Sequence, residues 1–143
     1  MLKQAKQNKN RLKILQPKTF NHKKIVFKQN DFYNKLNIKP VNVILLSNSI
    51  HFANINSIHF VLNNLLNYLS LNGLIIIKEP WINAIFADPK LNDDSILRNN
   101  KLNYIKKIKD EIFTFISNSS FIKLLDFNYF NDNQYYLLII KKI

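Results

Sequence analysis

The sequence predicts an α/β fold whose sheet ends in an antiparallel pair of strands. Two short apolar runs, 43–46 and 74–77, have the length and composition of buried strands, and a helical pattern separates them. A strand, a helix and a second strand in this order form a parallel unit. Two later apolar runs, 121–127 and 135–140, are joined by a short turn at 131–133, so we expect them to pair antiparallel.

The first third of the chain predicts one helix and two strands. Residues 2–15 carry a thin apolar stripe among Lys, Gln and Asn, which indicates a basic helix ending at Pro17. Residues 24–27 are β-branched and aromatic and predict a short strand, with a turn at 30–32. Residues 42–47 are almost wholly apolar, which predicts a central strand buried on both faces.

Two amphipathic helices are expected in the rest of the chain. Apolar residues at three- and four-residue spacing predict a helix over 58–69, closed by Asn72-Gly73, which holds the only glycine of the sequence. Periodicity is lost between 80 and 100, so this segment is expected to be a loop with about one helical turn. Residues 102–116 predict the second helix, with its lysines facing outward.

The charge of the chain favours a phosphate-bearing partner. The 143 residues amount to one domain and carry a net charge of +12. Nine basic residues precede the first acid, Asp31: Lys3, Lys6, Lys9, Arg11, Lys13, Lys18, Lys23, Lys24 and Lys28. A basic arm of this kind is typical of nucleic-acid binding, so RNA is an expected partner. The alternative is AT-rich codon bias, which raises Lys, Asn and Ile throughout a sequence.

Cysteine and histidine usage argues against a metal centre. The sequence has no cysteine, and its three histidines, His22, His51 and His59, lack the clustered spacing of metal ligands. The amino-terminal 15 residues are too charged for a signal peptide, and no apolar run approaches the roughly 20 residues that span a bilayer. We therefore expect an intracellular protein that binds neither metal nor membrane.

Polar side chains follow the two parallel strands, where α/β folds bind ligands. Ser47, Asn48 and His51 follow the first strand, and His51 is a candidate proton shuttle or phosphate donor. The alternative for His51 is a structural histidine whose hydrogen bonds are all satisfied. Glu79 follows the second strand and is a candidate to orient a substrate. Trp81 offers a stacking platform for a base, or else covers the core as a loop aromatic.

Several stretches carry a family resemblance, and three of them correspond to short family motifs. Ser47-Asn-Ser-Ile-His-Phe52 stands where the family has Ser-x-Thr-x-Trp-Ile-His-Leu-Asn, Leu69-Ser-Leu-Asn-Gly73 where it has Leu-x-Pro-Gly-Gly, and Glu79-Pro-Trp81 where it has Glu-Pro-Gln-Pro-Trp. Through them the chain resembles the Rossmann-like, class I S-adenosylmethionine-dependent methyltransferases, and among these the methylphosphate capping enzymes, the bicoid-interacting family. The resemblance implies methyl transfer to the 5′ γ-phosphate of small structured RNAs.

The resemblance also implies roles for individual residues. Asp31 would hydrogen-bond the adenine of S-adenosylmethionine and Phe32 would stack on it, although an ordinary turn aspartate beside a core aromatic is the alternative. Ser47 and Asn48 would contact the cofactor, and Ser47 and His51 would be catalytic. The residues that would contact RNA are His51, Glu79, Trp81, Lys23 and Lys24.

Departures from the family pattern leave the function open between two main hypotheses. The chain has no Gly-x-Gly loop, and Ser49 stands where the family has Trp. We expect a carboxyl-terminal half of the fold, one truncated domain with a basic helix and arm at 1–28 and a sheet core at 41–143, whose exposed edge invites a protein partner. The chain is then either a methyltransferase or a catalytically inactive, methyltransferase-like subunit that binds RNA or supports a partner enzyme. A plain RNA-binding protein is a third possibility.

Overall fold

The computed structural model describes residues 38–91 and 94–143. These residues belong to one compact unit, Lys35–Ile143, which contains the whole of the expected sheet core. Several expectations lie outside the described residues: the helix over 2–15, the strand over 24–27, and the roles of Lys23, Lys24, Asp31 and Phe32.

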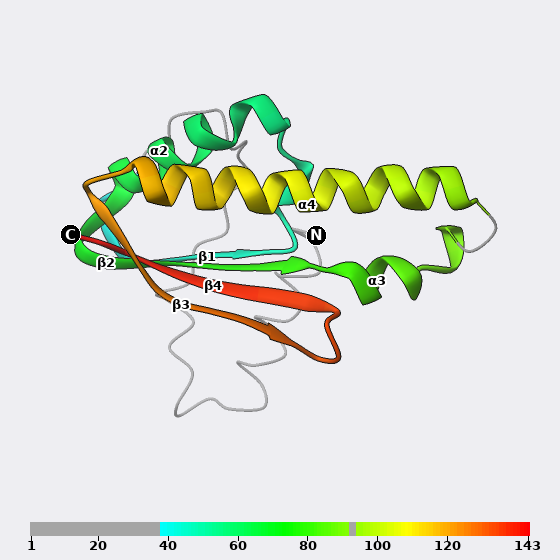
Figure 1. The fold of residues 1–143 in the computed structure, drawn as a ribbon. Coiled ribbons are helices and arrows are strands. Elements are labelled where there is room, and N and C mark those ends of the chain that lie inside the picture. The colour runs from blue at the N-terminus through cyan, green and yellow to red at the C-terminus, as the bar shows by residue number, and fades with distance from the viewer. Residues whose placement is uncertain (1–37, 92–93) are drawn as a thin grey trace, which may run out of the picture. The chain divides into compact units, whose positions relative to one another are not determined.

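Four strands form one sheet in the order β1-β2-β4-β3 (Figure 1). They are β1 (Val41–Ser47), β2 (Leu69–Pro80), β3 (Ile122–Phe130) and β4 (Tyr135–Lys142). β1 and β2 are parallel, whereas β4 is antiparallel to both of its neighbours. The predicted α/β fold with an antiparallel finish is therefore confirmed.

Two long helices cover one face of this sheet (Figure 1). α2 (Ile58–Tyr68) makes the crossover from β1 to β2, and α4 (Ser95–Asn118) leads from the far end of β2 back to β3. Short elements fill the connections: η2 (Ile50–Phe52), η3 (Ile55–Ser57), α3 (Ile82–Phe86) and η4 (Pro89–Leu91). In the described part of the chain, no helix is both long and apolar enough to cross a membrane.

The core lies between the helices and alternate residues of the central strands. β2 contributes Ile75 and Ile77, which are 1% and 0% exposed, and β4 contributes Leu138 and Ile140. The helices supply the facing apolar side chains, among them Ile58, Val61, Leu62, Ile105, Ile108 and Ile112. Each such side chain stabilises the fold by roughly 1.5–3 kcal/mol through removal of apolar surface from water.

The expectation that β1 is buried on both faces is wrong. Val43 and Leu45 are 52% and 65% exposed, whereas Leu46 is 6% exposed. Within the described residues β1 pairs only with β2, and neither helix covers the face on which Val43 and Leu45 lie. An apolar run predicts a strand, but it does not say how many layers pack against that strand.

α4 begins earlier than the periodicity predicts. It starts at Ser95, where the side chain of Asp94 caps it by accepting a hydrogen bond from the Leu97 backbone N–H at 2.9 Å. Ile96 and Leu97 lie on this first turn and are 72% and 53% exposed. These exposed apolar residues interrupt the helical spacing of apolar positions. The segment from 80 to 100 therefore shows no helical periodicity in the sequence, although it contains α3, η4 and the start of α4.

Asn72 and Gly73 do not close α2, contrary to expectation. α2 ends at Tyr68, and Lys142 takes the capping role by donating hydrogen bonds of 2.8 Å to the carbonyl oxygens of Leu66 and Leu69. Asn72 has a φ of 63° inside β2, where the pairing with β1 is irregular. Its neighbour Gly73 has no room for a side chain, because a Cβ would lie 2.7 Å from Leu69 Cγ.

Gly73→Ala is expected to lower the free energy of unfolding by about 1–3 kcal/mol, since the added methyl group would also lie 2.8 Å from the backbone oxygen of Ser70. Urea denaturation measures this loss. The control is Asn72→Gly, which should change stability by less than about 1 kcal/mol because glycine adopts positive φ without strain. Equal stability of Gly73→Ala and the unmodified chain would contradict the conclusion that Gly73 has no room for a side chain.

Candidate functional site

The candidate site lies at the carboxyl ends of the parallel strands β1 and β2. Asn48, with a φ of 49°, turns the chain out of β1, and its backbone N–H donates to the Lys78 carbonyl oxygen at 2.8 Å. The following residues form the 3₁₀ turn η2, which carries His51 to the end of β2 and to Glu79. The strand-end residues that the sequence singled out are thus brought to one edge of the sheet.

Glu79 is the anchor of this edge. Its side chain is 1% exposed, and among the described residues it is the only buried charged one. Oε1 accepts hydrogen bonds from the backbone N–H groups of Ser49 and Ile50, at 2.7 and 2.9 Å, and Oε2 accepts one from Nδ1 of His51. A buried carboxylate is costly without such partners, so these three bonds hold the loop after β1 against β2.

His51 is oriented by its bond to Glu79. Because Nδ1–H donates to the carboxylate, the neutral ring keeps its other nitrogen, Nε2, free to accept a proton. The side chain is 16% exposed, and its ring lies 4.1 Å, centroid to centroid, from that of Phe52, which is 73% exposed. A partly exposed imidazole whose inner nitrogen donates to a carboxylate is an arrangement typical of histidines that act as general bases.

Tyr136 lies beside Glu79 in the core. No sequence pattern identified it as part of the candidate site. It pairs with Glu79 across β2 and β4, is 0% exposed, and within the described residues its hydroxyl has no hydrogen-bond partner. Burial, and next the negative charge of Glu79, raise the pKa of the Tyr136 hydroxyl far above its usual value. Tyr136 therefore stays neutral beside the carboxylate.

Trp81 lies in the core. It is 8% exposed, its ring packs against Tyr129 and Tyr136, and Nζ of Lys109 sits 4.4 Å above the ring centroid. Lys109 also donates to the Tyr129 hydroxyl at 3.1 Å, which keeps the ammonium group in place. A base could stack on Trp81 only after Lys109 moved away, so this position agrees with the core-covering alternative.

Ser47 and Asn48 are the candidates for cofactor contact that lie within the described residues. Ser47 and Asn48 are exposed at the end of β1, and their polar side chains could hold a ligand there. The only glycine of the sequence, Gly73, lies at the other end of the sheet, so it cannot form a glycine-rich loop at this edge. Within the described residues no cluster of three or more His, Cys, Asp or Glu side chains could bind a metal ion.

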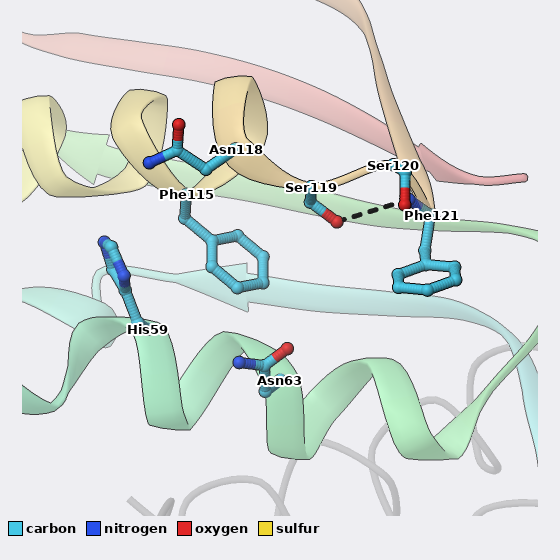
Figure 2. Close-up of a pocket in the computed structure, with 7 residues that line it drawn as sticks. All are labelled: His59, Asn63, Phe115, Asn118, Ser119, Ser120 and Phe121. Atoms are coloured by element: carbon cyan, nitrogen blue, oxygen red, sulfur yellow. Dashed lines mark hydrogen bonds between the residues drawn. The ribbon is translucent and has the colours of Figure 1, made fainter.

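A separate pocket of about 240 Å³ opens between α2 and α4 (Figure 2). It is lined by His59, Asn63, Phe115, Asn118, Ser119, Ser120 and Phe121, and none of these is a predicted site residue. His59 is paired with the Glu111 carboxylate at 3.1 Å, and both side chains are half-exposed. We assign this pocket to the surface between the helices rather than to the site at the strand ends.

Comparison with solved structures places the fold among methyltransferases. The chain is similar to an O-methyltransferase family 2 protein from Planctomyces limnophilus, crystallised with apigenin, with a TM-score of 0.53 and 15% identity over 80% of this chain. It is also similar to TnmH, with a TM-score of 0.58 and 12% identity over 92% of this chain. The matches span only 34% and 39% of those proteins. No protein-family model matches the sequence, and a search of curated proteins finds no match.

The likeness establishes a Rossmann-like methyltransferase fold for the described chain. Within this fold, β1 and β2 end at the edge that holds His51 and Glu79.

Glu79→Gln is expected to lower the free energy of unfolding by about 2 kcal/mol or more, because a neutral amide weakens three charge-assisted hydrogen bonds in a buried place. The matched control is Glu111→Gln, which removes only the half-exposed pair with His59 and should cost less than about 1 kcal/mol. Denaturant unfolding of the two variants checks the difference. Equal losses would mean that Glu79 does not anchor the loop.

Proposed function

We propose that this chain acts in S-adenosylmethionine-dependent methyl transfer, with His51 as the residue that contacts the methyl acceptor and Glu79 as the residue that orients His51. The single observation that supports the proposal is the His51–Glu79 pair at the carboxyl ends of two parallel strands of a methyltransferase fold. Ser47 and Asn48 would contact the cofactor, together with Asp31 and Phe32 if the family resemblance holds.

Methyl transfer requires few protein groups. S-adenosylmethionine, when bound, supplies an electrophilic methyl group. Where the acceptor is a hydroxyl, Nε2 of His51 takes its proton, and the carboxylate of Glu79 stabilises the imidazolium that forms. The hydrogen bond at Nδ1 keeps the ring in the tautomer that can do this, so Glu79 is a positioning residue rather than a catalytic one.

The acceptor we propose is RNA, and in particular its 5′ phosphate end. The net charge of +12 and the resemblance to the methylphosphate capping enzymes support this choice. A phosphate oxygen carries no proton to remove, so in that case a protonated His51 would donate to the phosphate through Nε2. The two cases differ at Nε2 of His51: a base needs this nitrogen free of a proton, whereas a phosphate donor needs a proton on it.

A second candidate is a catalytically inactive, methyltransferase-like subunit. The exposed residues Val43 and Leu45 on β1 favour it, because a partner protein could cover them and pair with the edge of β1, which within the described residues has no other strand beside it. In this case the chain would bind RNA or support a partner enzyme without transferring methyl groups itself.

His51→Ala is expected to lower the rate of methyl transfer to a 5′-triphosphate RNA by roughly 10- to 100-fold, because a lost hydrogen bond to a charged phosphate costs about 1.5–3 kcal/mol. The control is His59→Ala, which removes a half-exposed histidine from α2 and should leave the rate unchanged. Radiolabelled methyl incorporation measures both, and calorimetry with S-adenosylmethionine tests cofactor binding directly. Equal activity of His51→Ala and the unmodified chain would overturn the role of His51 at the methyl acceptor.

The same calorimetric titration separates the two candidate functions. Micromolar binding by the folded chain supports an enzyme in its own right. No binding up to millimolar cofactor, from a sample whose circular dichroism shows a folded protein, supports the inactive subunit and contradicts the enzyme.

A further inference from the structure

Among the described residues, a cation and two stacked aromatic rings lie on the sheet face that neither α2 nor α4 covers. Lys78 of β2, Tyr135 of β4 and Phe130 of β3 occupy this face, because each alternates with a neighbour that faces the helices. All three lie at the carboxyl end of β2, where Pro80 pairs with Tyr135 and Tyr135 with Phe130. They therefore share an edge with the candidate site.

The three side chains form one cluster. The Phe130 and Tyr135 rings are stacked with centroids 5.6 Å apart and planes at 26°. Nζ of Lys78 lies 4.4 Å from the Tyr135 centroid and 5.6 Å from that of Phe130. Phe130 is 37% exposed, and among the described residues no carboxylate pairs with the Lys78 ammonium.

This combination matches the chemistry of a nucleotide. An exposed aromatic ring offers a face on which any base can stack, and a lysine beside it can neutralise a phosphate. Open sheet faces that carry aromatic and basic side chains are a common platform for single-stranded RNA. Trp81, the aromatic that the sequence singled out for stacking, is 8% exposed beneath Lys109, whereas Phe130 is 37% exposed.

The cluster is also placed where an RNA end could reach His51. Lys78 is the sheet partner of Ser47, and the next residue along β2 is Glu79, which holds His51. Phe130 on β3 lies three strand spacings from β1, or about 14 Å. Phe130 lies on the face opposite to Glu79, so the RNA would also pass around the carboxyl end of β2, and a stretch of several nucleotides can reach from Phe130 to His51 in this way.

We propose that Phe130, Tyr135 and Lys78 form a binding site for single-stranded RNA, with a base stacked on Phe130 and a phosphate held by Lys78. The site deepens the RNA part of the proposed function by naming the residues that make the contact. It does not depend on methyl transfer, because an inactive subunit would bind RNA through the same residues.

The test uses the full chain and a fluorescent 5′-triphosphate single-stranded RNA of about ten nucleotides, within the range of known site sizes. Fluorescence anisotropy should show that Phe130→Ala weakens binding roughly tenfold, the loss typical of one stacked base. Phe130→Trp should bind as tightly as the unmodified chain. The matched control is Phe121→Ala, because Phe121 is 69% exposed but lies at the opposite end of the sheet.

Lys78→Gln supplies a second, independent readout. It should lower the slope of log affinity against log salt concentration by about 0.7, as expected for one lost phosphate contact to a single strand. This slope separates a phosphate contact from a lysine that only packs on its own aromatic neighbours, since a packing role would leave the slope unchanged. Unfolding curves confirm that each variant remains folded.

Three results would overturn the site: unchanged affinity of Phe130→Ala, equal weakening by Phe121→Ala, or no RNA binding by the unmodified chain. Failure of methyl transfer alone is a different outcome. If His51→Ala and the unmodified chain bind RNA equally and neither transfers methyl groups, the proposed enzyme fails and the RNA site stands.

Discussion

The arrangement of the residues at the carboxyl ends of β1 and β2 depends on one buried charge. Glu79 lies in the core with its carboxylate surrounded by three donors, two from the backbone of the loop after β1 and one from His51. An ionised group in such a place destabilises the fold by several kcal/mol if it loses its partners. The loop therefore cannot swing away from β2 without exposing or neutralising Glu79, and the orientation of His51 follows from the same constraint.

The fold could be predicted because its signals are local. The helical spacing of 58–69, the short apolar strands and the turn at 131–133 each depend on neighbours in sequence, and the structure confirms the elements and the antiparallel finish. Burial of β1 could not be predicted, since it depends on what packs against Val43 and Leu45. The role of Gly73 could not either, because the contact that excludes a side chain there comes from the way Leu69 packs.

The candidate site was predictable in place but not in detail. The rule that ligands bind beyond parallel strand ends identified Ser47, His51 and Glu79, and the structure brings His51 and Glu79 into contact across 28 positions of sequence. That Glu79 would be buried, and Tyr136 behind it, follows from the pairing of β2 with β4 rather than from any motif. Likewise, no sequence pattern connects Lys109 of α4 with Trp81, yet that contact covers the Trp81 ring.

The two consecutive residues Lys78 and Glu79 explain why the register of β2 matters for function. Successive side chains of a strand point to opposite faces, so Glu79 enters the core while Lys78 meets the open face. A slip of one residue would place an ammonium group in the core without acceptors and a carboxylate beside Phe130 and Tyr135, and both changes are unfavourable. The requirement to satisfy Glu79 therefore also positions the cation and rings of the opposite face, which couples the His51 site to the proposed RNA surface through a single strand.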